Sequence, residues 1–73
     1  MIGIWVKPPL ENRQPDLHSI MLTLSSLGVE IIEYFKEEPP SLIVVARNKV
    51  EEGVIGGVLF QNHIDWEPYK LPD

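Results

Sequence analysis

The sequence predicts an α+β fold in which two helices pack on a sheet of four strands. One segment, residues 16–28, carries the start signal, the apolar stripe and the stop signal of a helix. A second segment, residues 48–63, repeats the helical spacing of apolar residues. Four short segments rich in β-branched and aromatic residues are typical of strands.

The first helix is predicted over residues 16–28. Asp16 can accept hydrogen bonds from the free N–H groups of the first turn, and its charge suits the positive end of the helix dipole. Gly28 can adopt the left-handed backbone that closes a helix. The apolar residues follow the i, i+3, i+4, i+7 spacing at Leu17, Ile20, Met21, Leu24 and Leu27. We therefore expect this stripe to face the core.

Three of the strands are predicted over residues 1–7, 29–35 and 41–47. The first contains Ile, Trp and Val and ends at two prolines, and the second mixes alternation with β-branched and aromatic residues. The third is a nearly continuous apolar run, which indicates the middle of the sheet. The link between the second and third strands is too short for a parallel crossover, so they should pair as an antiparallel hairpin. The first two, separated by a helix, can be parallel in a right-handed βαβ unit.

Residues 48–63 admit two interpretations. Asn48 followed by Glu51 resembles a capping box, which favours a helix. The apolar residues at helical spacing are Val50, Val54, Ile55, Val58 and Leu59. Against this, three glycines (Gly53, Gly56 and Gly57) each cost a helix about 0.8–1 kcal/mol, and residues 54–59 have the pattern of a Gly-Gly hairpin. We favour the helix.

The last strand is predicted over residues 66–71, at an edge of the sheet because an edge tolerates Pro68. The resulting order, strand–helix–strand–strand–helix–strand, is that of the ferredoxin-like split βαβ sandwich. The alternative is a longer antiparallel sheet with a single helix and a Gly-Gly hairpin. We expect one small α+β domain over residues 1–73, since no linker or low-complexity tract divides the chain.

Composition narrows the range of functions. The chain has 73 residues, a net charge of −5 and no cysteine, which excludes disulfides and thiolate chemistry. An acidic chain without a basic cluster is not expected to bind nucleic acid. No apolar stretch is long enough to span a membrane, and residues 1–5 lack the features of a signal peptide, so we expect a cytoplasmic protein without membrane contact.

One candidate ligand site surrounds the loop before the first helix. Lys7, Asn12, Arg13 and Gln14 form the only concentrated set of hydrogen-bond donors in the chain, and the loop leads to the helix start at Asp16. A small anion could bind there, but the Asp16 carboxylate competes for the same N–H groups, so weak binding is expected. The alternative is a set of solvated loop charges.

A second candidate is a divalent-metal site. In an extended segment His63, Asp65 and Glu67 would share one face, and an imidazole with two carboxylates can ligate a metal. The alternative is a polar strand face with Ile64 and Trp66 packed inward. We assign no catalytic residue and no cofactor, because the serines lack a nucleophile context and the paired glycines lack the following Gly-Lys-Ser/Thr of a phosphate loop.

Two segments carry a family resemblance over less than a third of the chain. The segment Asn12-Arg13-Gln14-Pro15-Asp16, the apolar helix and the segment Gly28-Val29-Glu30-Ile31 resemble the N-x-P-G turn, first helix and G-I-N-I strand entry of ACT domains. The match departs at one extra residue before Pro15, at Asp16 in place of glycine and at Glu30 in place of asparagine. The resemblance implies a ferredoxin-like regulatory module that holds a small effector near the turn at a dimer interface.

The leading hypothesis is a non-enzymatic regulatory or protein-interaction module that self-associates as a homodimer. A chain this short buries only about 60% of its unfolded surface, so association would add stability. The helices can cover the apolar run 42–46 on one face only, which leaves the other face for pairing. The rival hypothesis is a small metal-dependent enzyme or enzyme subunit that uses His63, Asp65 and Glu67.

Overall fold

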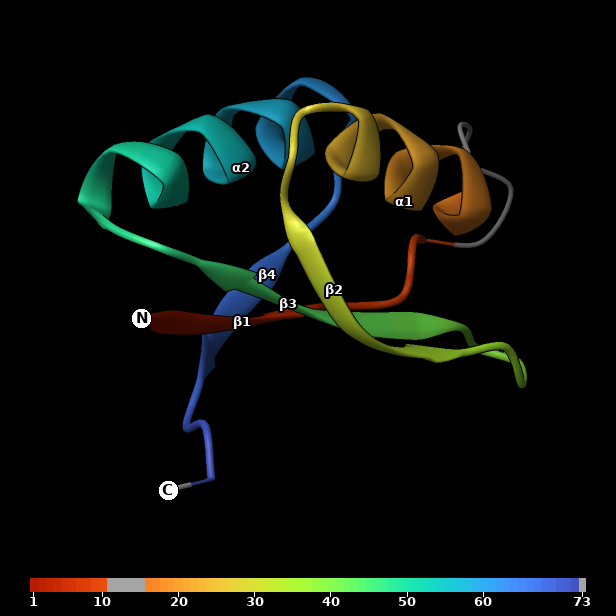
Figure 1. The fold of residues 1–73 in the computed structure, drawn as a ribbon. Helices are drawn as coiled ribbons and strands as arrows, with labels where there is room; N and C mark the ends of the chain where they lie inside the picture. Colours follow the sequence, from red (N-terminus) through yellow and green to blue (C-terminus); the bar gives the residue numbers. More distant parts are fainter. Residues whose placement is uncertain (11–15, 73) are drawn as a thin grey trace.

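The computed structural model describes residues 1–10 and 16–72, and its elements follow the predicted order (Figure 1). The strands and helices are β1 (Ile2–Val6), α1 (Leu17–Ser26), β2 (Glu30–Phe35), β3 (Ser41–Ala46), α2 (Lys49–Gln61) and β4 (Trp66–Tyr69). Neither helix in the described residues is long and apolar enough to cross a membrane.

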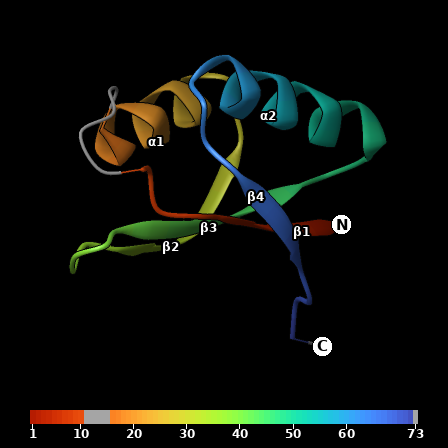
Figure 2. The same ribbon diagram turned by 180° about the vertical axis from the view of Figure 1, so that it is seen from behind.

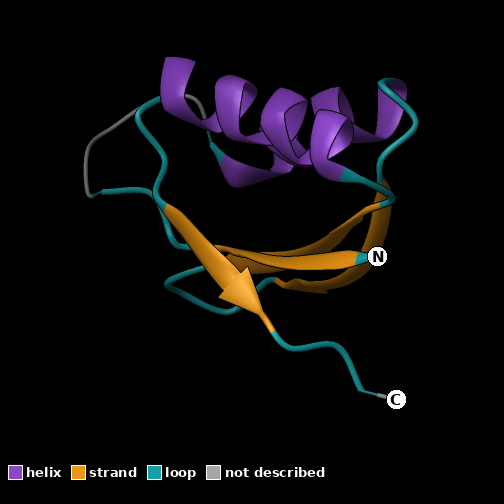
Figure 3. Cartoon of the chain, turned by 90° about the vertical axis from the view of Figure 1, so that its left-hand side faces the viewer, coloured by secondary structure: helices purple, strands orange, loops and turns teal. Residues whose placement is uncertain are grey.

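The four strands form one sheet in the order β2-β3-β1-β4, and every neighbouring pair is antiparallel. β1 and β2 therefore run parallel with β3 between them, which confirms the ferredoxin-like layout and the central position of residues 41–47. β2 lies nearest the viewer in Figure 1 and β4 nearest in Figure 2. Both helices cover the same face of the sheet, and the chain end projects beyond the opposite face (Figure 3).

Helix α1 starts as the sequence predicts. One Asp16 carboxylate oxygen, Oδ1, accepts hydrogen bonds from the backbone N–H groups of His18 at 2.6 Å and Ser19 at 3.4 Å. The stripe is buried at Leu17, Ile20 and Leu24. Leu27, which we expected on the same buried stripe, is half exposed; it is the C-cap residue, after the helix ends at Ser26.

The segment after Asn48 is helical, so the hairpin alternative is wrong. The Asn48 side chain accepts the Glu51 N–H at 2.9 Å, as an N-cap. Ile55 and Leu59 are fully buried, and each contributes about 1.5–3 kcal/mol of hydrophobic stabilisation. Together with the cap, this burial offsets the roughly 3 kcal/mol that three glycines cost a helix relative to alanine.

The two helices end in the same way. Gly28 and His63 both have positive φ, 86° and 59°. Each donates its N–H to the carbonyl three residues earlier, and the following residue bonds five residues back, from Val29 to Leu24 at 3.1 Å and from Ile64 to Leu59 at 2.9 Å. These are two Schellman motifs, and the apolar residue that closes each motif is buried.

The hydrophobic core lies between the helices and the sheet. Its buried residues are Ile4, Val6, Leu17, Ile20, Leu24, Val29, Leu42, Val44, Ala46, Ile55, Leu59 and Ile64. On β2, Ile31 and Tyr34 pack against this core although they are three residues apart, since the register shifts between Ile31 and Glu33. The extra residue, Ile32, breaks the alternation that a regular strand would show.

Candidate functional site

The predicted anion site is only partly described by the structure. Lys7 forms an ion pair with Glu67, with 3.0 Å between Nζ and Oε2. The Asp16 carboxylate binds the N–H groups of the first turn of α1. Asn12 and Arg13 lie outside the described residues. Both described members of the site are thus already engaged within the chain, and anion binding there stays a prediction.

The metal hypothesis required an extended segment from His63 to Glu67, and the chain is not extended at its first residue. His63 has φ 59° in the turn that ends α2, whereas Glu67 lies on β4 and pairs with Lys7. Among residues 1–10 and 16–72, no group of three or more His, Asp or Glu side chains is arranged to hold a metal ion. The structure therefore does not bring His63, Asp65 and Glu67 together as ligands.

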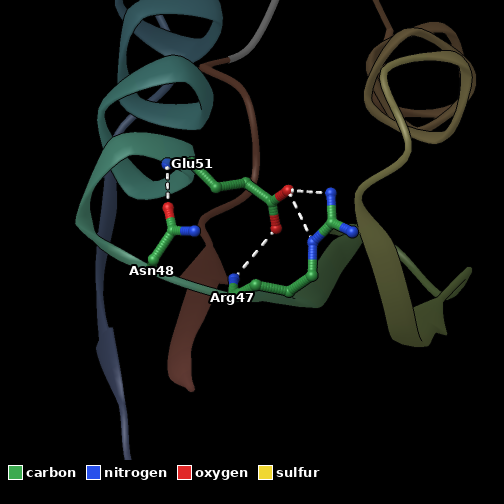
Figure 4. A network of polar contacts seen from close by, with 3 residues as sticks. All are labelled: Arg47, Asn48 and Glu51. Carbon is green, nitrogen blue, oxygen red and sulfur yellow. Dashed lines mark hydrogen bonds and ion pairs between the residues drawn. The ribbon is translucent and has the colours of Figure 1, made fainter.

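Arg47, Asn48 and Glu51 form a polar network at the start of α2 (Figure 4). The sequence predicted the contact between Asn48 and Glu51 but not the part played by Arg47. The Glu51 carboxylate accepts the backbone N–H of Arg47 at 2.9 Å, and it accepts Nε at 3.0 Å and Nη2 at 2.7 Å from the Arg47 guanidinium. In the predicted capping box Glu51 would instead bind the N–H of Asn48. Hydrogen bonds from the Arg47 side chain and then from its backbone lower the pKa of Glu51.

The Arg47 side chain also reaches towards the end of α1. Its Nη2 atom lies 4.0 Å from the point where a Cβ on Gly28 would be. A shallow hollow of about 460 Å³ adjoins the network, lined by Leu27, Val29, Arg47, Asn48, Val50, Glu51 and Val54. The only charges in this lining neutralise each other, so the network joins β3 to α2 and offers no free charge to a ligand.

No described helix covers the face of the sheet away from α1 and α2 (Figure 3). We call it the open face. Pairing across the strands places these side chains on it: Trp5, Glu30, Glu33, Phe35, Ile43, Val45, Glu67 and Tyr69. Ile43 and Val45 form its floor and are 6% and 3% exposed. The apolar side chains of β3 are therefore buried on both faces of the sheet within one chain. The homodimer was predicted partly because one face of residues 42–46 was expected to remain exposed, and that expectation is wrong.

The exposed apolar surface of the open face lies instead along its edges. Phe35 on β2 is 46% exposed and Tyr69 on β4 is 40% exposed. Ile32, at the irregularity in β2, is 47% exposed but is not assigned to this face by the strand register. At the β4 edge, two Leu71 side-chain atoms lie 2.9 Å from the position of a Cβ on Gly3, so the glycine is required for this close approach. Sequence reasoning missed these edge residues, because their exposure depends on strand order.

Part of the ACT-domain resemblance, residues 12–15, lies outside the described residues, and at Asp16 the structure shows an N-cap. The resemblance and the effector site that it implies stay expectations. Comparisons of the chain with protein-family models, with curated protein sequences and with solved structures found no match.

Proposed function

We propose that this chain is a non-enzymatic interaction module that forms a homodimer through the open face of its sheet. The observation that carries the proposal is the exposure of Phe35 and Tyr69 on either side of an apolar floor, on a face that no described helix covers. Exposed large apolar side chains that border an apolar surface can mark a contact surface.

The dimensions of the open face suit a small interface. Four strands about 4.8 Å apart and about six residues long give a face of roughly 19 by 20 Å, or about 400 Å² in projection. Standard interfaces bury about 800 Å² of accessible surface on each partner. Two stacked open faces fall below that size, and Leu71 takes up part of the β4 edge, so we expect weak association.

The charges at the edges favour one orientation of the two sheets. The β2 edge presents Glu30 and Glu33, whereas on the β4 side Glu67 is already paired with Lys7. A two-fold axis parallel to the strands would place β2 of one copy over β4 of the other and keep the two acidic β2 edges apart. An axis across the strands would stack β2 on β2 and oppose like charges, which is unfavourable.

Sedimentation velocity over a range of protein concentrations tests the dimer. The wild-type chain should exceed its monomer mass of 8.3 kDa as concentration rises. Phe35→Lys places a charge on the open face and should raise the dimer dissociation constant at least about tenfold. Leu22→Lys, at an exposed position on α1, is the matched control and should behave as wild type. An unchanged dissociation constant for Phe35→Lys would contradict the proposal.

The effector hypothesis is tested separately, by NMR chemical shifts with a panel of amino acids and nucleotides. Shifts in residues 7–20 would support a small-molecule site at the loop that contains Lys7 and Arg13. Shifts confined to residues 60–73 would assign binding to the other end of the chain and contradict the loop site.

A further inference from the structure

Gly3 leaves a gap in the open face. Strand pairing places it between Val45 on β3 and Tyr69 on β4, in a row of four positions that begins with Glu30 on β2. Gly3 contributes no side chain to this row, yet it is itself buried, and the neighbouring Val45 is only 3% exposed. Another part of the chain therefore covers the gap.

The side chain of Leu71 occupies the space above Gly3. A Cβ on Gly3 would lie 2.9 Å from both Cγ and Cδ2 of Leu71, and it would also overlap the carbonyl oxygen of Tyr69. Leu71 follows the last residue of β4 and is nevertheless partly buried. Glycine inside a strand often marks a place where another part of the chain approaches closely. Gly3 thus provides the seat for the Leu71 side chain.

Residues 70–72, which we call the strap, lie where a stacked sheet would have to pack. The chain leaves β4 on the open-face side, so the strap projects from this face (Figure 3). Two sheets that stack face to face lie about 10 Å apart, and side chains from both fill the space between them. The strap occupies part of this space over β1 and β4. A second copy cannot seat fully on the open face while Leu71 covers Gly3.

We infer that the strap regulates the open face, because Leu71 and a second copy of the chain compete for the surface around Gly3. This competition presupposes the homodimer proposed above. Release of the strap uncovers Gly3 and the adjoining side chains of Val45 and Tyr69, which widens the surface that two stacked sheets can bury. The closed strap favours the monomer and the open strap favours the dimer.

The size of the effect depends on the fraction of chains whose strap is open. The apparent dissociation constant rises as the competent fraction falls, and for a homodimer this fraction enters twice because both copies must open. A strap held through one partly buried leucine opens readily. If about one third of the chains are open, the closed strap raises the dissociation constant about tenfold.

Leu71→Ser tests the inference because its two expected effects have opposite signs. Loss of the contact with Gly3 should lower the melting temperature at low micromolar concentration by about 4 °C. The dissociation constant in sedimentation velocity should fall about tenfold. Leu22→Ser, at an exposed position on α1, is the matched control and should leave the dissociation constant unchanged. A dissociation constant that stays the same or rises in Leu71→Ser would overturn the inference.

NMR of the wild-type chain follows the strap without any substitution. Nuclear Overhauser effects between the Leu71 methyl groups and the Gly3 Hα protons should be present in dilute protein. They should weaken as the concentration rises and the dimer forms. Effects that keep their full intensity in the dimer would show that the strap stays closed there, which contradicts the inference.

The double variant Leu71→Ser with Phe35→Lys separates the strap from the proposed dimer. Phe35→Lys should abolish the gain in association, and a gain that survives would overturn the inference. A wild-type chain that stays monomeric while Leu71→Ser dimerises would contradict the wild-type dimer but support the strap. A dimer that Phe35→Lys weakens and Leu71→Ser leaves unchanged would support the open face and overturn the strap. Leu71→Ser that is monomeric at millimolar concentration would overturn both.

Discussion

The two helices lie in one layer on the same face of the sheet, but their outer faces differ. The outer side of α1 carries one apolar residue, Leu22, among five polar ones: His18, Ser19, Thr23, Ser25 and Ser26. Two of these hydroxyls bond to the helix itself, from Thr23 to the Ser19 carbonyl at 3.1 Å and from Ser26 to the Thr23 carbonyl at 2.8 Å. The outer stripe of α2 consists of Val50, Gly53, Val54, Gly57 and Phe60, and Gln61 at the helix end is the one polar side chain in the same arc. Both helices bury their inner faces in the same core, which requires apolar residues there. A difference in function between the helices therefore lies in their outer faces.

The largest expected effect tests the similarity of the inner faces. Leu24→Glu in α1 and Leu59→Glu in α2 each place a charge at a fully buried position, at a cost that exceeds the few kcal/mol of stability of a chain this short. Both variants should lose their native circular dichroism spectrum. Leu22→Glu, at a 55% exposed position, should keep it. A folded Leu24→Glu variant would show that the stripe of α1 does not face the core.

The next effect uses the difference between the helix ends at the residue with positive φ, which is glycine after α1 and histidine after α2. A non-glycine residue with left-handed backbone costs about 1–2 kcal/mol, so His63→Gly should stabilise the fold by about 1 kcal/mol in urea denaturation. Gly28→Ala should destabilise it by a similar amount. If His63 serves as a metal ligand instead, divalent ions should raise the wild-type melting temperature and leave His63→Gly unaffected. We expect no such difference.

A slightly smaller effect tests the outer face of α2. Gly53→Ala should raise the free energy of unfolding of the monomer by up to about 1 kcal/mol, because the added methyl group meets open space and alanine favours the helix. Ser25→Ala on the outer face of α1 should change it by no more than about 0.5 kcal/mol. Measurements at low micromolar concentration keep association from contributing. Destabilisation by Gly53→Ala would mean that the glycine has a role within the chain.

The smallest expected effect is the contribution of the Arg47–Glu51 ion pair to stability. The start of α1 has no such pair among the described residues. The guanidinium and backbone N–H of Arg47 hold the pKa of Glu51 below its ordinary value of 4.5, so folding favours the ionised form. The stabilisation is therefore fully present above about pH 4.5 and disappears as pH falls through the lower, folded-state pKa. Glu51→Gln should lower the urea midpoint at pH 7 and approach wild type in strong acid. Equal midpoints for the two proteins at pH 7 would show that the pair is not stabilising, and Glu52→Gln is the control.

Local patterns in the sequence determined most of the fold. The caps at Asp16 and Asn48, the turn glycine Gly28 and the hairpin before β3 each depend on neighbours a few residues away, and all are present in the structure. They depend on backbone hydrogen bonds and on φ preferences that short segments carry within themselves. For the same reason the element order and the ferredoxin-like layout could be predicted.

Tertiary structure decided what the sequence left ambiguous. Residues 48–63 have a helical period and a glycine content that disfavours a helix, and only the burial of Ile55 and Leu59 against the sheet selects between the two. His63 was expected in an extended segment, but the Schellman motif that buries Ile64 requires positive φ at that position. The exposed residues at the edges of the open face and the outer stripe of α2 depend on which elements become neighbours. That information lies in contacts between residues far apart in the chain, which local propensity does not encode.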